Sequence, residues 1–188
     1  MRPIEIETER LYIKAIDISD LGDYCDNFLL DTVVQKYTCW TCSNKKDAKG
    51  FLEEWQLNYN SPDRIYWLWG IYLKETGKCI GSIDCIEGML GYVLGRQYWN
   101  KGITSEAAAA VLQCMFRHTI TREIIAEHNV ENVYSGKVLQ KVGMTYVKQI
   151  SGEDNTGKCK NDLYMMTIGR YEHQARYNQL YKGITFRA

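Results

Sequence analysis

Apolar and polar residues alternate along this chain with two periods, which divide it into short strands and amphipathic helices. Residues 4–15 are rich in β-prone side chains and predict a first strand that ends before Asp17. After Asp17 or Ser19, either of which can serve as an N-cap, apolar residues recur at helical spacing and predict a helix. A second helix is predicted from Ser43. Its apolar face carries Phe51, Leu52, Trp55 and Tyr59.

The rest of the pattern alternates strands with helices and contains no linker, repeat or low-complexity segment. The predicted elements are strands 64–73, 79–87 and 89–94, helix 104–118, strand 123–127, helix 132–142, strands 144–150 and 162–169 around a polar hairpin, and a terminal helix near 170–181. The chain has 188 residues, of which 45% are hydrophobic. We therefore expect one α/β domain over residues 1–188.

One stretch, residues 98–110, joins a glycine turn to the start of an alanine-rich helix; it reads YWNKGITSEAAAA. N–H groups of the turn and of the first helical turn, with the positive end of the helix dipole, form a cradle for a pyrophosphate. Gly102 lets a phosphate approach the backbone. Thr104 and Ser105 suit the helix N-cap, and Glu106 suits the dipole. A purely structural connection explains the local sequence equally well.

Two common phosphate-binding motifs do not fit this stretch. In a P-loop that starts at Gly95, Asn100 would replace the second glycine and Gly102 would replace the magnesium-binding hydroxyl. The spacing of Gly95 and Gly102 also excludes the dinucleotide fingerprint.

The stretch resembles instead the acyl-CoA-binding motif of the GNAT acetyltransferases, Arg/Gln-x-x-Gly-x-Gly/Ala. Trp99 stands at its first position, Asn100 replaces a glycine, and Thr104 replaces the final Gly/Ala. The wording is closest to the branch similar to ribosomal-protein N-terminal acetyltransferases, in which a Gly-Tyr-Trp-Leu strand precedes Tyr-Trp-Gly-Lys-Gly. Here residues 91–94 read GYVL, and residues 8–14, TERLYIK, resemble the opening strand of that branch.

A second motif lies in residues 129–144, which read NVENVYSGKVLQKVGM. Ser135 shares a helical face with Val138, Leu139 and Val142, and a polar residue near a helix cap is one interpretation. The spacing also resembles the family's second cofactor motif, Asn-x-x-Ser-x-x-Val-Leu-Glu-Lys-x-Gly-Phe. That resemblance implies that Asn132 lies near the pantetheine arm and Ser135 beside the thioester sulfur. Leu139 occupies the position of the tyrosine that many members use to protonate the thiolate, so Ser135 is the expected donor.

The resemblance extends from Thr8 to about residue 170 and implies an α/β (α+β) GNAT fold. This is a mixed, mostly antiparallel twisted sheet of about seven strands, with helices on both faces. The implied cosubstrate is acetyl-CoA, and the N–H groups of Val93 and Leu94 would hold the acetyl oxygen. The implied cofactor-binding residues are Val93, Leu94, Trp99, Asn100, Lys101, Gly102, Ile103, Thr104, Ser105, Asn132 and Ser135.

The general base is not marked by the motif. An alkyl amine has a pKa of about 10.4, so attack on a thioester requires a base or a water chain to one. Relatives carry a glutamate where this chain has Met89, and the nearest carboxylates are Asp84 and Glu87. Asp84 shares a strand face with apolar residues, which would raise its pKa, whereas Glu87 abuts a turn, where a solvated side chain is the favoured interpretation. His118 and His128 are further candidates, with structural roles as the alternative.

These features predict acetyl transfer from acetyl-CoA to a primary amine in a direct ternary complex. The resemblance favours a protein N-terminus as the acceptor. A small amine, such as a polyamine, amino acid or antibiotic, is the alternative. A non-catalytic acetyl-CoA-binding module is the alternative from another class, because the usual glutamate and tyrosine are both replaced. The identity of the acceptor stays open, as does the choice between monomer and homodimer.

Composition limits the other partners. The formal net charge is zero and no basic run occurs, so we expect no nucleic-acid partner. The absence of a long apolar segment predicts a soluble, cytoplasmic protein without a membrane partner. Seven cysteines lie at irregular spacing, and Cys39 and Cys42 form the only CxxC pair. We expect reduced thiols and no metal site.

Overall fold

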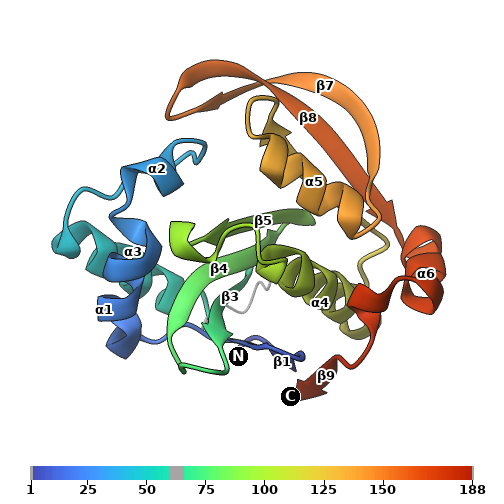
Figure 1. Cartoon of the computed structure of the whole chain (residues 1–188), viewed down its shortest axis with the longest axis horizontal. Helices are drawn as coiled ribbons and strands as arrows, with labels where there is room; N and C mark the ends of the chain where they lie inside the picture. The colour runs from blue at the N-terminus through green and yellow to red at the C-terminus, as the bar shows by residue number, and fades with distance from the viewer. Residues whose placement is uncertain (1, 60–65, 188) are drawn as a thin grey trace.

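The computed structural model describes residues 2–59 and 66–187. Within these residues one sheet has the strand order β7-β8-β6-β5-β4-β3-β2-β1-β9, and every neighbouring pair is antiparallel except β5 and β6 (Figure 1). The strands are β1 Glu5–Glu7, β2 Leu11–Lys14, β3 Tyr66–Leu73, β4 Cys79–Ile86, β5 Met89–Leu94, β6 Glu123–Asn129, β7 Thr145–Asp154, β8 Gly157–Thr167 and β9 Thr185–Arg187. The mostly antiparallel mixed sheet confirms the predicted fold.

The sheet has nine strands rather than about seven, because both ends of the chain differ from the prediction. The first predicted strand, residues 4–15, is a hairpin of β1 and β2, in which Thr8 N–H donates to the Leu11 carbonyl at 3.0 Å. After the predicted terminal helix, β9 returns to pair with β1. The predicted strand 64–73 corresponds to β3, and residues 64 and 65 lie outside the described residues.

Helices cover both faces of the sheet, as predicted (Figure 1). They are α1 Leu21–Tyr24, α2 Thr32–Gln35, α3 Lys45–Asn58, α4 Ile103–His118, α5 Val133–Lys141 and α6 Ile168–Tyr177, with a π-helical turn Cys25–Leu29 after α1. Asp17 caps the first helical turn and Asn44 caps α3. Helix α2 lies in a segment for which the sequence predicted no element.

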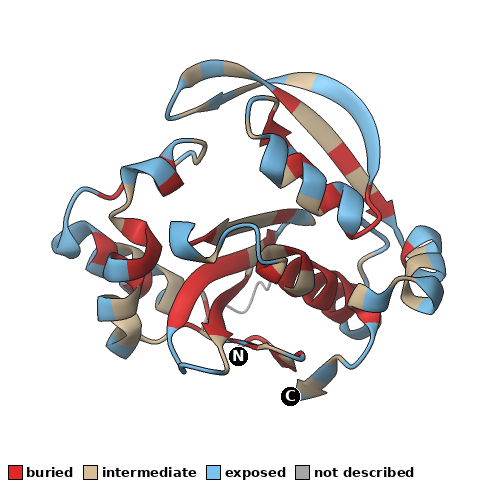
Figure 2. Ribbon diagram, in the orientation of Figure 1, coloured by how far each residue is buried: buried red, intermediate tan, exposed pale blue. Residues whose placement is uncertain are grey.

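Helix α4 is the central helix of the larger core. Its four alanines, Ala107 to Ala110, are fully buried between the sheet and the C-terminal elements (Figure 2). Side chains as small as alanine let a helix lie close to a sheet, so the start of α4 is held firmly against β5. A second core, on the other face, is formed by α1, the π-helical turn and α3 with β3 and β4.

Strands β5 and β6 separate soon after they begin. Met89 and Ile125 form their one registered pair, whereas β5 has six registered pairs with β4 and β6 has seven with β8. Beyond that pair, the backbone groups of β5 that face β6 have no ladder partner among the described strands. The sheet is therefore split next to the end of β5, where the predicted cofactor turn begins.

The β7–β8 hairpin is longer than predicted and reaches across to the segment after α2 (Figure 1). At its tip, the Asn155 N–H donates to the Thr38 carbonyl at 3.1 Å, and Asn155 Nδ2 donates to the carbonyls of Gln35 and Trp40 at 2.9 and 2.8 Å. The buried Gln35 side chain in turn bonds the main chain of Cys42. These bonds fix the segment after α2 relative to the hairpin.

Candidate active site at the split between β5 and β6

The turn before α4 places two residues in the left-handed backbone region, Asn100 with φ 60° and Gly102 with φ 74°. Helix α4 begins at Ile103, so Gly102 is its N-cap and makes no side-chain cap. The prediction that Thr104 or Ser105 caps the helix was wrong, because the glycine turn starts the helix earlier. The N–H groups of Ile103, Thr104 and Ser105 therefore remain open for a ligand, since the first intrahelical bond is made by Glu106 N–H.

Glu106 in the first turn of α4 ties this turn to the N-terminal hairpin. Its carboxylate accepts from Thr8 Oγ1 at 2.6 Å, from the Arg10 N–H at 3.0 Å and from Arg10 Nε at 2.6 Å. Arg10 Nη1 also donates to the Lys101 carbonyl at 2.9 Å, which holds the turn from its other side. The sequence predicted only a dipole interaction for Glu106.

Two cationic side chains lie beside Gly102. A Cβ added there would lie 3.7 Å from Arg10 Nη2 and 3.8 Å from Lys141 Nζ, and would meet nothing closer. The open helix terminus, the glycine and the two cations suit an anionic group such as a pyrophosphate, and Arg10 Nη2 is also paired with Glu106 Oε2 at 2.6 Å. Arg10 and Lys141 were not among the predicted cofactor-binding residues. Lys141 lies within the second motif, which was the only signal for it.

The end of β5 is held by Trp99, whose indole Nε1 donates to the Leu94 carbonyl at 2.7 Å. The Gly95 N–H donates to the Ile80 carbonyl on β4 at 2.8 Å. Because donors alternate along an antiparallel strand, the Val93 N–H also faces β4 and the Leu94 N–H faces the split.

Ser135 lies in the first turn of α5, and Asn132 is the N-cap of that helix. The Asn132 side chain accepts from the Ser135 N–H at 3.4 Å. Tyr92 extends from β5 to this turn: its hydroxyl lies 3.0 Å from the Ser135 carbonyl oxygen and 2.9 Å from Ser135 Oγ. Leu139, at the position of the family tyrosine, is fully buried. Tyr92 was not a predicted site residue.

Asp84 lies on the face of the sheet opposite to Tyr92 and Ser135. It pairs across β3 and β4 with Leu68, which belongs to the second core. It pairs with Gly91 across β4 and β5, and a Cβ at Gly91 would lie only 2.8 Å from Asp84 Oδ1 and 3.0 Å from Oδ2. The glycine therefore makes room for the carboxylate. Burial raises the pKa of Asp84 from 3.8 to about 7, because the charged form loses its hydration.

The other candidate bases occupy different environments. Glu87 (φ 51°) lies in the exposed turn between β4 and β5, next to Gly88, and Met89 is 41% exposed. His118 packs on Phe186 at the far end of α4, with ring centroids 4.8 Å apart. His128 is buried beneath α5, with Nδ1 2.8 Å from the Asn129 carbonyl oxygen.

Glu127 is a carboxylate that the sequence analysis missed. Its neighbours Ala126 and His128 in β6 are buried on the side of α4 and α5, so alternation directs Glu127 to the face of Asp84. From the Met89–Ile125 pair, two steps along each parallel strand bring Gly91 and Glu127 to the same level. Strand alternation was the signal that could have identified it.

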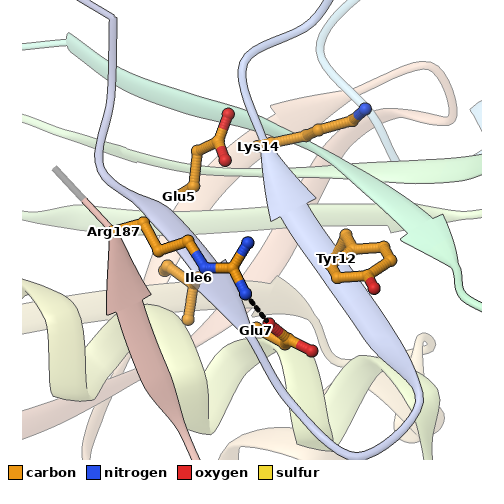
Figure 3. A pocket seen from close by; sticks show the side chains of 6 residues that line it. All are labelled: Glu5, Ile6, Glu7, Tyr12, Lys14 and Arg187. Atoms are coloured by element: carbon orange, nitrogen blue, oxygen red, sulfur yellow. Dashed lines mark hydrogen bonds and ion pairs between the residues drawn. The ribbon is translucent and has the colours of Figure 1, made fainter.

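Other features of the described residues limit the candidate sites. They contain no group of three or more His, Cys, Asp or Glu side chains arranged to hold a metal ion. No helix in the described part of the chain has the length and apolar character needed to cross a membrane. Each of the seven cysteines is a free thiol. A shallow pocket lies over β1, β2 and β9, at the β9 edge of the sheet, and contains no predicted site residue (Figure 3). It is lined by Glu5, Ile6, Glu7, Tyr12, Lys14 and Arg187.

Comparison with known proteins gives consistent matches. A family model described as the acetyltransferase (GNAT) domain matches residues 10–145. The uncharacterized N-acetyltransferase YnaD of Bacillus subtilis is 30% identical over 147 residues, which cover 75% of this chain and 82% of that protein. Ribosomal-protein-S5-alanine acetyltransferase from Vibrio fischeri is similar in structure, with a TM-score of 0.75, 19% identity and coverage of 87% of this chain and 96% of that one. RimJ from Mycobacterium smegmatis, in complex with CoA-disulfide, has a TM-score of 0.78, 15% identity and coverage of 93% and 92%.

Proposed function

This chain belongs to the GNAT acetyltransferase family and is an acetyl-CoA-dependent N-acetyltransferase, and we propose that it acetylates a protein N-terminal α-amino group across the split between β5 and β6. One observation carries the proposed site. The split, with its single registered pair, has Ser135 on one face of the sheet and Asp84 on the other. A thioester in the split would thus meet a hydroxyl and a carboxylate from opposite sides.

The proposed cofactor site follows from the order of these elements. The N–H groups of Ile103, Thr104 and Ser105 bind the pyrophosphate of CoA at the open terminus of α4, with Gly102 giving close access. The exposed turn Trp99–Lys101 borders this phosphate site. The pantetheine arm passes Asn132 and reaches Ser135. The side chains of Ile103 and Ser105 are buried, so these two residues contribute backbone N–H groups only.

Each reacting group has a proposed partner in this chain. Acetyl-CoA supplies the acetyl group as a thioester. The Leu94 N–H, which faces the split, donates to the carbonyl oxygen as negative charge develops there; Val93 shapes the strand and directs its own N–H to β4. Asp84 accepts the proton that the attacking amine loses, because a carboxylate with a pKa of about 7 is a competent base at neutral pH. Ser135 Oγ donates to the sulfur, which leaves with the electron pair of the broken C–S bond.

The acceptor is the least constrained part of the proposal. The Vibrio fischeri protein, which is similar in fold, is named as a ribosomal-protein alanine acetyltransferase, and this supports a protein N-terminus. A small amine is the alternative within the same chemistry. A non-catalytic acetyl-CoA-binding module is the alternative from another class, and the partly buried carboxylate beside Gly91 argues against it, because a binding module needs no base.

Turnover with a panel of amines tests the proposal. Purified protein is mixed with acetyl-CoA and either N-terminal peptides or small amines, and free thiol release is measured. We expect release with peptides, and Ser135→Ala should lower kcat by about 10- to 100-fold with little change in KM for acetyl-CoA. CoA binding without thiol release for any amine would support the module instead. Release with small amines alone would overturn the protein acceptor.

The same assay distinguishes the candidate bases. Asp84→Asn, Glu87→Gln and Glu127→Gln each remove one carboxylate at nearly constant volume. We expect the largest loss, about a hundredfold in kcat, for Asp84→Asn. An equal loss for Glu127→Gln or Glu87→Gln, with Asp84→Asn active, would assign the base to that residue.

A further inference from the structure

The Tyr92 hydroxyl contacts the Ser135 hydroxyl, and the acetyl-transfer proposal uses only the serine of this pair. The two residues lie 43 residues apart in sequence, on β5 and α5, and their oxygens are 2.9 Å apart. The Tyr92 hydroxyl also lies 3.0 Å from the Ser135 carbonyl oxygen. One tyrosine thus contacts both the side chain and the main chain of the proposed thiolate donor.

The direction of these bonds follows from which atoms carry hydrogen. A carbonyl oxygen only accepts, so Tyr92 must donate its one hydrogen to the Ser135 carbonyl if that bond is made. The 2.9 Å contact then has Ser135 Oγ as donor and Tyr92 Oη as acceptor. In this arrangement the hydrogen of the serine points at the tyrosine and is not available to a sulfur.

A negative charge beside Ser135 favours the opposite arrangement. Ser135 Oγ–H would turn to the thiolate, and Tyr92 would turn its hydrogen to Ser135 Oγ. The Ser135 carbonyl would still have an acceptor role within α5, since it lies four residues before Leu139 in that helix. A hydroxyl that accepts one hydrogen bond is a stronger donor in the next, because the chain polarises cooperatively.

The position and chemistry of Tyr92 suit this switch. Its ring packs against the larger core, so the hydroxyl is held in place. Burial raises the pKa of Tyr92 well above its ordinary value, more than the Ser135 contact lowers it. The phenol therefore remains a hydrogen-bond donor throughout the neutral pH range.

We infer that Tyr92 is a positioning residue for the departing thiolate. Tyr92 acts by donating its hydrogen to Ser135 while Ser135 donates its own hydrogen to the sulfur. This inference rests on the proposed role of Ser135 and extends it to a two-hydroxyl relay between β5 and α5. No proton leaves either residue: the thiolate receives a hydrogen bond, and the charge stays on sulfur until solvent protonates it.

The pKa of the thiol of bound CoA tests the relay without any acceptor amine. The product CoA is bound to the protein, thiolate absorbance is followed against pH, and the complex with desulfo-CoA serves as the blank. We expect the bound thiol to have a lower pKa than free CoA. Ser135→Ala should raise it by about one unit, and Tyr92→Phe by roughly half a unit, because the serine then keeps its hydrogen but loses its polarising donor.

Two further variants make the test specific. In Tyr92→Phe/Ser135→Ala the thiol pKa should equal that of Ser135→Ala alone, since Tyr92 acts only through the serine. Tyr181→Phe is the matched control, because Tyr181 is a buried tyrosine whose hydroxyl donates to the Val142 carbonyl at the other end of α5, at 2.8 Å. It removes the same kind of bond and should leave the thiol pKa unchanged.

The outcomes separate this inference from the proposed function. If the thiol pKa is raised in Ser135→Ala but equals the wild-type value in Tyr92→Phe, then Tyr92 has only a packing role. This result would overturn the relay and leave the proposed role of Ser135 intact. A wild-type thiol pKa in Ser135→Ala would overturn the relay together with the role of the serine. Failure of the wild-type protein to bind CoA would overturn the proposed function itself. If Tyr92→Phe weakens folding, turnover with acetyl donors of different thiol acidity replaces the titration. A loss of kcat relative to the wild type that does not grow with the basicity of the leaving thiol contradicts the relay.

Discussion

Asp84→Asn should make the protein more stable above neutral pH while it lowers kcat by about a hundredfold. The carboxyl group lies over Gly91, and burial raises its pKa from 3.8 to about 7. The native state therefore binds this proton more tightly than the unfolded state does. As pH rises from about 4 to about 7, the unfolded chain ionises first, so the free energy of unfolding falls with pH.

The size of the effect follows from the shift. About three pKa units at 1.36 kcal/mol each set an upper limit of about 4 kcal/mol on the stability lost by the wild type above pH 7, and of under 2 kcal/mol at pH 5, because Asp84 is only partly buried. Asparagine has the same shape and no charge to desolvate. We expect Asp84→Asn to exceed the wild type by up to about 4 kcal/mol at pH 8, and by much less at pH 5.

Urea denaturation at a series of pH values measures this difference. Glu87→Gln is the control, because it removes a carboxylate from the neighbouring exposed turn and should change stability by about 0.5 kcal/mol or less. In the wild type, kcat/KM should rise with pH through about 7, and this limb should vanish in Asp84→Asn. Equal stability of Asp84→Asn and wild type at pH 8, with parallel pH curves, would refute the raised pKa of the Asp84 carboxylate.

Three further changes probe the geometry of the site. Gly102→Glu puts bulk and negative charge into the pyrophosphate cradle at a left-handed position, so CoA affinity should fall at least about tenfold; an unchanged Kd by calorimetric titration would contradict the cradle. Gly91→Ala places a Cβ 2.8 Å from the Asp84 carboxylate and should lower kcat while CoA affinity is kept; a wild-type kcat would show that the carboxylate position is unimportant. Asn155→Ala removes the contacts between the β7–β8 hairpin and the segment after α2 and should lower the free energy of unfolding by about 1–3 kcal/mol, measured against Thr156→Ala; equal stability of the two variants would contradict a bridging role.

Local pattern was enough to predict most elements and one half of the site. Helices α3, α4 and α5 and strands β3 to β6 lie where periodicity placed them, because each depends on residues a few positions apart. The glycine turn before α4 is likewise a local feature, and it directs the backbone by the conformational freedom of Gly102. The first strand was predicted as continuous, because a turn at Thr8 carries no glycine or proline signal.

Contacts between distant segments decided the rest. Asp84 lies beside Gly91 only because β4 and β5 pair in one register, and a slip of one residue would move the carboxylate to the opposite face. Tyr92 meets Ser135 because β5 separates from β6 and α5 packs over the gap, and Arg10 reaches the turn at Lys101 across 91 residues of sequence. Such placements depend on strand pairing and helix packing throughout the domain. The residue types were visible in the sequence, but their mutual distances were determined by the fold.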